Sequence, residues 1–256
     1  AGLDAGDYTD VRQNAAGALL SVDRSLESVF AALGDRADET LFVFASDNGG
    51  LAGFGGSNWP LRGEKLTLFE GGVRVPAFLW AGSKLAPRTA GTTYAGLVHV
   101  SDITPTLLGA AFGDVAWDGY GRDLHRVLLE GAGPEREDLL YGASASAEDE
   151  GVLVTSAFRD GRYKLITNVA YCDAADTDAV VSCACDDVRS YLFDIVDDPT
   201  ESKDLMDELP HVAEDLMRRA KAQIAALKPE AATDTFREGD RALVGALALA
   251  SKTGGS

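Results

Sequence analysis

The sequence predicts an α/β protein with a mostly parallel sheet, followed by a smaller C-terminal antiparallel sheet plus a helix. Apolar residues recur every three or four positions over 10–33, the spacing of an amphipathic helix, and a buried apolar strand follows at 41–45. A helix that leads into such a strand is typical of a parallel sheet. Further along, short strand-like segments over 139–168 with a turn at Asp160-Gly161 indicate an antiparallel hairpin.

The first unit is expected to continue through a second apolar strand at 77–81, which follows a tight bend at the two glycines of 71–72. A short strand near 97–100 and a helix to about Phe112 come next, with Ser101 or Asp102 as the N-cap of the helix. These elements are assigned to a first unit, residues 1–133.

The second unit is expected to span residues 134–228 and to form a small α+β subdomain. Its strands are predicted at 139–144, 152–159, 162–168 and 191–195, and its helix at 210–227, which begins with the permissive first-turn residue Pro210. The remaining residues, 229–256, are rich in Ala, Gly and polar residues, and they are expected to form a mobile tail.

Composition excludes some classes of partner. The chain has 256 residues, 46% of them apolar, and a formal charge of -18, which argues against an electrostatic nucleic-acid surface. No apolar stretch is long enough to span a membrane, and the first ten residues do not resemble a signal peptide. Three cysteines lie close together in the sequence, and a disulfide between Cys172 and either Cys183 or Cys185 is favoured over metal binding.

The strand at 41–45 ends abruptly in Ser46-Asp47-Asn48-Gly49-Gly50. In open α/β sheets, ligands bind at the carboxyl ends of the strands. Asp47 and Asn48 carry hard oxygen donors that suit Ca²⁺ or Mg²⁺ better than zinc. On these residues alone an ordinary turn remains the competing interpretation.

A glycine-rich loop follows and leads to Arg62 and Lys65. Glycine has no Cβ, so such a loop allows the backbone to approach a bound anion closely. Two cations near the oxygen donors of Asp47 and Asn48 fit a site for a metal together with an oxyanion. A solvated lysine is the alternative for Lys65. His99 lies on an apolar segment, where it is either a ligand or a packed core residue.

The order of these motifs closely resembles the C-terminal half of the sulfatase family, nearest the arylsulfatase B type, over about residues 8–227. The motifs that carry the resemblance are SDNGG (46–50), NWPLRGEK (58–65), EGGVRVP (70–76), HVSDITPT (99–106), and YLFDI (191–195) followed by Asp198-Pro199. The resemblance implies a partial alkaline-phosphatase-like fold, a Ca²⁺ ion at the carboxyl end of the central sheet and a formylglycine nucleophile. By position in the motifs, Asp47 and Asn48 match calcium ligands, and Lys65 matches the lysine that binds the substrate sulfate.

The family's nucleophile motif, Cys or Ser followed by x-Pro-x-Arg, does not occur in this sequence. No catalytic residue is therefore assigned within the chain, and its calcium site is expected to be incomplete. The resemblance implies sulfate ester hydrolysis when the N-terminal half of a sulfatase is present. The alternative is a non-catalytic remnant that acts as an acidic binding or interaction module. The family is commonly lysosomal, secreted or periplasmic, and the resemblance implies such a location here.

Overall fold

The computed structural model of the protein describes residues 5–85, 87–133, 135–145, 153–170 and 188–226. The predictions for the three cysteines and for the mobile tail fall outside these residues. Within them, no helix is both long enough and apolar enough to cross a membrane.

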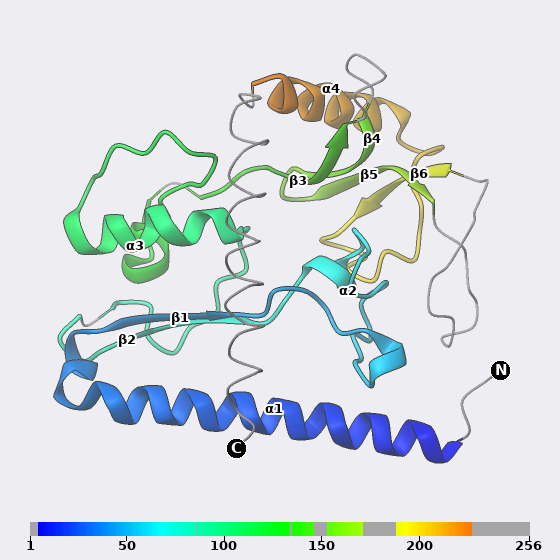
Figure 1. Ribbon diagram of the computed structural model, residues 1–256. Helices are drawn as coiled ribbons and strands as arrows, with labels where there is room; N and C mark the ends of the chain where they lie inside the picture. Colours follow the sequence, from blue (N-terminus) through cyan, green and yellow to red (C-terminus); the bar gives the residue numbers. More distant parts are fainter. Residues whose placement is uncertain (1–4, 86, 134, 146–152, 171–187, 227–256) are drawn as a thin grey trace.

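The first unit contains a long helix and a two-stranded sheet (Figure 1). Helix α1 (Ala5–Leu33) leads through a 3-10 turn (Gly34–Glu39) into β1 (Leu41–Ala45), which pairs with β2 (Ala77–Ala81). Helix α1 begins earlier than predicted, whereas both strands have their predicted bounds. The ring of Phe30 lies 5.0 Å from Phe42 and 4.9 Å from Trp80 between centroids, so aromatic contacts hold α1 against the sheet.

Strands β1 and β2 run antiparallel, with Leu41 opposite Ala81 and Ala45 opposite Ala77. The mostly parallel sheet that the sequence predicts is therefore not formed by these two strands. A parallel pair needs a crossover connection, usually a helix of several turns. The link between β1 and β2 contains only a 3-10 turn (Ala52–Phe54) and the four-residue helix α2 (Glu70–Val73), so the chain folds back on itself.

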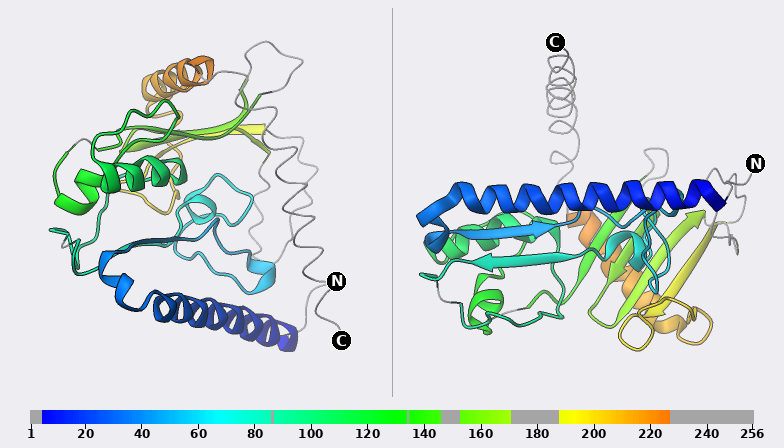
Figure 2. Two further views of the ribbon diagram at one scale, coloured as in Figure 1. Left: turned by 60° about the vertical axis from the view of Figure 1, so that its left-hand side comes forward. Right: turned by 90° about the horizontal axis from the view of Figure 1, so that it is seen from below.

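The second unit is a four-stranded antiparallel sheet covered by one helix, as the sequence predicts. The strand order is β3 (Leu139–Ala145), β4 (Leu153–Arg159), β5 (Tyr163–Ala170) and β6 (Val188–Asp194). Asp160 and Gly161 form the predicted turn between β4 and β5, with Gly161 at a φ of 77°. Helix α4 (Pro210–Ala226) begins at the predicted proline and covers one face of the sheet, as Figure 2 shows from two sides.

The two faces of this sheet have different partners. On one face, Leu216 of α4 packs with Phe158 and Leu165 of the strands. On the other, Phe69 of the first unit is fully buried against Ile166 and Phe193. The segment that joins β1 to β2 therefore contributes to the core of the second unit. The division of the chain at residues 133 and 134 stays a prediction.

A buried ion pair joins the start of helix α3 (Ile103–Phe112), in the first unit, to the start of the second unit. Helix α3 follows a 3-10 turn (Val100–Asp102), and it ends where the sequence predicts. The short strand expected near 97–100 is reduced to a single bridge between Leu97 and Arg136. Arg136 donates from Nε and Nη2 to the two carboxylate oxygens of Asp102, over 2.9 and 2.6 Å. These side chains are 1% and 0% exposed.

Candidate functional site

Asp47 and Asn48 lie in the turn that directly follows β1. The backbone of this turn is held by Ser46, whose N–H donates to the Pro76 carbonyl and whose hydroxyl donates to the Asn48 carbonyl, over 3.0 and 2.9 Å. The side chain of Asp47 is exposed and that of Asn48 is half-buried. Among the described residues neither side chain makes a hydrogen bond or an ion pair, so their oxygens are available to a ligand.

Glycines allow the turn to contact the segment before β2. The Gly49 N–H donates to the Gly72 carbonyl over 2.9 Å, and a Cβ added at Gly49 would lie 1.8 Å from the Gly71 carbonyl oxygen. Gly71 in turn donates to the Arg62 carbonyl over 2.7 Å. Real Cβ atoms do not approach a carbonyl oxygen that closely, so side chains at these positions would separate the backbones.

Hydrogen bonds to Gly50 bring the Lys65 backbone beside the same turn. Asn58 donates from Nδ2 to the Gly50 carbonyl and accepts from the Gly50 N–H through Oδ1, over 2.8 and 2.7 Å. The Lys65 N–H donates to the same carbonyl over 3.2 Å. The structure thus brings the loops of the three predicted site residues, Asp47, Asn48 and Lys65, together. No role was predicted for Asn58, although it begins the motif at 58–65.

The side chains of Lys65 and Arg62 lie in different environments. Lys65 is exposed, and its ammonium makes no hydrogen bond or ion pair with the described residues. The guanidinium of Arg62 lies over the buried Phe69 ring, 4.3 Å from its centroid, and donates to the Glu201 carbonyl over 3.2 Å. The Lys65 ammonium is therefore available to an anion, whereas the Arg62 guanidinium has a structural role in joining its loop to the second unit.

Asp47 and Asn48 carry the oxygen donors that a hard cation prefers, but two side chains are fewer than the ligands that such an ion needs. Ca²⁺ takes six to eight oxygen ligands. Within the described ranges, no group of three or more His, Cys, Asp or Glu side chains is arranged to hold a metal. The remaining ligands of such an ion would have to come from backbone oxygens, water or a further part of the protein.

His99 is a structural residue rather than a ligand of this site. It precedes the 3-10 turn at 100–102, where its N–H donates to Asp102 over 2.8 Å and its Nδ1 accepts from the Ser101 N–H over 3.3 Å. Burial is the main reason that the pKa of His99 lies below its ordinary value of 6.5, with Arg136 adding to this effect and Asp102 opposing it.

Because the pKa of His99 is lower in the folded state than in the unfolded chain, the unfolded chain binds more protons as the pH falls toward and below 6.5. The free energy of unfolding is therefore expected to fall as the pH is lowered from 7 toward the folded-state pKa. Replacing His99 by Gln should make this fall smaller. Urea titrations between about pH 7 and 5 measure the effect. An equally steep fall in His99→Gln would contradict the assignment, and His211→Gln is a control because His211 is an exposed residue of α4, in a different part of the fold.

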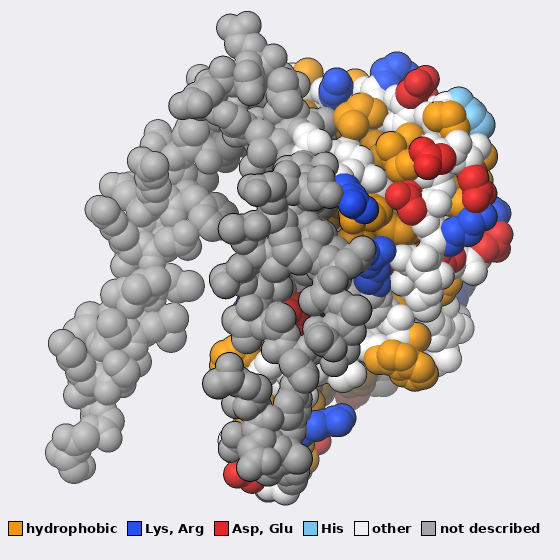
Figure 3. All heavy atoms as spheres, turned by 90° about the vertical axis from the view of Figure 1, so that its right-hand side faces the viewer, with side chains coloured by type: hydrophobic (Ala, Val, Ile, Leu, Met, Phe, Trp, Pro, Cys, Tyr) orange, Lys and Arg blue, Asp and Glu red, His pale blue; other side chains and the backbone are white. Residues whose placement is uncertain are grey.

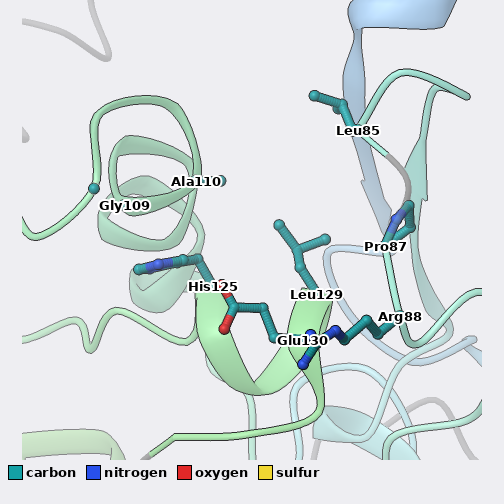
Figure 4. A pocket seen from close by; sticks show the side chains of 9 residues that line it. Leu85, Pro87, Arg88, Gly109, Ala110, His125, Leu129 and Glu130 are labelled. Atoms are coloured by element: carbon teal, nitrogen blue, oxygen red, sulfur yellow. The ribbon is translucent and has the colours of Figure 1, made fainter.

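A pocket of about 510 Å³ lies away from the predicted site residues, between α3 and the segment around Leu85 and Arg88 (Figure 4). His125 points toward Gly109 and Ala110 of α3, and its Nδ1 lies 2.8 Å from an Asp123 carboxylate oxygen. None of the three residues expected at the site lines it.

The surface charge has no single-sign pattern on the face shown in Figure 3, where Lys and Arg side chains alternate with Asp and Glu among apolar side chains.

Comparison with known proteins identifies relatives over most of the chain. The Sulfatase family model matches residues 4–113. Arylsulfatase J of Mus musculus is 32% identical over 238 residues, which cover 81% of this chain and 39% of that protein. Arylsulfatase A of Bos taurus is 32% identical over 225 residues, 83% of this chain and 42% of that protein. The chain thus spans about 40% of the length of these curated relatives.

A solved structure gives the same result for the fold. The PsFucS1 sulfatase from Pseudoalteromonas sp. superposes with a TM-score of 0.60 at 25% identity, covering 81% of this chain and 42% of that chain. The predicted partial α/β fold is thereby confirmed, while the finer resemblance to the arylsulfatase B type stays a prediction. The chain belongs to the sulfatase family of the alkaline-phosphatase-like superfamily and corresponds to part of the length of its members.

Proposed function

We propose that this chain is the C-terminal portion of a sulfatase that hydrolyses sulfate esters at a calcium site, and that the N-terminal half of a sulfatase completes it. The observation that carries the proposal is the arrangement around Gly50. Its carbonyl accepts from the Lys65 N–H over 3.2 Å, and it lies two positions after Asn48. One backbone contact therefore joins a pair of oxygen donors to an exposed cation.

Sulfatases generally use a metal ion. Asp47 would contribute its carboxylate and Asn48 its amide oxygen, and both donor types suit Ca²⁺. When bound, the ion would neutralise sulfate oxygens and so supply electrostatic stabilisation. Because these two side chains fall short of the ligands that Ca²⁺ prefers, the remaining donors are assigned to the N-terminal half.

Lys65 would bind the substrate sulfate. Its ammonium offers three donors and a positive charge, which favour a sulfate oxygen and the negative charge that develops on it or on the leaving oxygen. The sequence lacks the nucleophile motif of the family. In this proposal the chain binds and orients the ester, and the nucleophile comes from the N-terminal half.

Exposed apolar side chains support the proposal that this chain binds the N-terminal half of a sulfatase. Trp59 and Leu66, which lie on either side of Lys65 in the sequence, are 87% and 89% exposed. Helix α1 also exposes Leu19 and Leu20. Large apolar side chains that are exposed in this way are found at protein interfaces. The N-terminal half of a sulfatase is the partner that we assign to them.

An aryl-sulfate assay tests the proposal. The chain alone is expected to give no turnover, whereas the chain fused to the N-terminal half of an arylsulfatase should release the phenol. The control is the same fusion with the nucleophile of the N-terminal half replaced by Ala. Turnover by the isolated chain would refute the division of residues between the two halves.

Calcium should stabilise the completed protein through Asp47. An ion at 100 times its dissociation constant adds about 2.7 kcal/mol to the free energy of unfolding. We expect Ca²⁺ to raise the midpoint of thermal unfolding, and Asp47→Ala to remove most of this rise. Asp114→Ala, which changes an exposed carboxylate elsewhere, is the control. If Ca²⁺ left the midpoint unchanged, the alternative of a non-catalytic acidic interaction module would be favoured.

A further inference from the structure

A lysine is fully buried between two carboxylates where the two units meet. Nζ of Lys164, on β5, lies 2.9 Å from a carboxylate oxygen of Glu70 and 2.8 Å from one of Glu201. All three side chains are 2% exposed or less. Buried charges are costly unless they are paired and hydrogen-bonded, so each of these groups depends on the others.

The surroundings keep Lys164 charged. Burial lowers the pKa of Lys164, but Tyr141, Glu70 and Glu201 together outweigh burial, so the pKa lies above its ordinary value. Arg159 lies 3.5 Å from the second oxygen of Glu70. Arg74 lies 3.8 Å from the same oxygen. Three cations therefore lie beside the two carboxylates, and Lys164 is the one that lies beside both, so removing it would take away the cation next to Glu201.

Glu70 connects this buried cluster to the proposed site. It is the first residue of α2, and its own N–H donates to Glu201 over 2.6 Å. The next two residues make the contacts described above. Gly71 donates to the Arg62 carbonyl, and Gly72 accepts from the Gly49 N–H. The position of Glu70 thus determines where the turn with Asp47 and Asn48 meets the loop of Lys65.

The Lys65 loop is also held at both of its ends by the second unit. Before Lys65, the Arg62 guanidinium donates to the backbone carbonyl of Glu201. After Lys65, the Phe69 side chain is 0% exposed and packs against the strands, and Glu70 pairs with Lys164. Glu201 therefore contacts both ends of the loop.

We infer that Lys164 is a positioning residue for the proposed site. By joining Glu70 to Glu201, it fixes the ends of the Lys65 loop and the glycine contact that holds the turn with Asp47 and Asn48. A point charge with three donors contacts both carboxylates at once, which an apolar side chain of similar length would not do. This inference rests on the proposed function for its catalytic meaning, although the geometry itself is independent of it.

Backbone hydrogen exchange tests the inference without any assay of activity. In Lys164→Met, the amides of Gly49, Lys65 and Gly71 are expected to exchange at least about tenfold faster than in the unchanged chain. The matched control is Leu216→Ala, which loosens α4 on the opposite face of the same sheet. In Leu216→Ala those three amides should keep their protection, measured under conditions where both variants are folded. Lys164→Arg should restore part of the protection.

Unchanged exchange in Lys164→Met, or equal acceleration in both variants, would overturn the inference. If Lys164→Met fails to fold, Glu201→Gln replaces it, because that change keeps the shape and removes one charge; the same three amides should then be accelerated. In the completed protein, Lys164→Met should also raise KM for an aryl sulfate more than Leu216→Ala does. If the unchanged protein hydrolyses no sulfate ester, the proposed function fails, while the exchange result still decides the role of Lys164.

Discussion

Replacing Asp102 by Asn is expected to lower the free energy of unfolding by about 3–5 kcal/mol, the cost of removing one partner of a buried ion pair. Asp102 is 0% exposed and accepts four hydrogen bonds. Two come from the guanidinium of Arg136, and the others from the backbone N–H groups of His99 and Arg122. An Asn side chain would leave the Arg136 charge buried without a counter-charge and would place an NH₂ group against one of these donors.

A surface pair is the matched control for this prediction. Lys84 and Glu39 lie 2.8 Å apart, but their side chains are 62% and 65% exposed. Exposed pairs contribute about 1 kcal/mol or less. Urea unfolding of Asp102→Asn and Lys84→Ala compares the two directly. A loss in Asp102→Asn no larger than that in Lys84→Ala would show that Arg136 finds another partner.

Local patterns predicted most of the elements because their causes are local. The apolar periodicity of α1 and α4, the apolar runs of β1 and β2, and the Asp160-Gly161 turn each depend on residues that are close together in the sequence. The direction of β2 relative to β1 does not. It depends on what the connecting segment can form, and this segment has glycines at 49, 50, 71 and 72 in place of a crossover helix.

The candidate site residues were assigned for a different reason. Asp47, Asn48 and Lys65 were assigned from their positions in motifs that resemble a family, and the hydrogen bonds of Gly50 bring their loops together. The residues that hold this arrangement were not predictable. Lys164 and Glu201 lie 94 and 131 positions after Glu70. A lysine in a strand with alternating polarity indicates a solvent-facing position, and only the tertiary fold places it between two carboxylates.

Replacing Lys65 by Ala should reduce kcat/KM for an aryl sulfate by about 10²–10³ in the completed protein, the effect of removing one donor to the developing charge. Lys65→Arg should retain part of the activity, because the charge remains while the geometry of its donors changes. Lys203→Ala is the control, since Lys203 is also an exposed lysine, pairs with Glu208 and lies far from Lys65 in the sequence. The Lys65 ammonium has no partner among the described residues, so the fold should not depend on it.

The division of the Lys65 effect between KM and kcat would show how the lysine acts. If it binds the sulfate equally in the ground state and the transition state, Lys65→Ala raises KM and leaves kcat unchanged. If it acts on charge that develops on the leaving oxygen, kcat falls. We expect both, because the ester already carries a negative sulfate and gains charge at the bond that breaks. An unchanged kcat/KM would remove Lys65 from the site and leave Asp47 and Asn48 as a metal-binding turn alone.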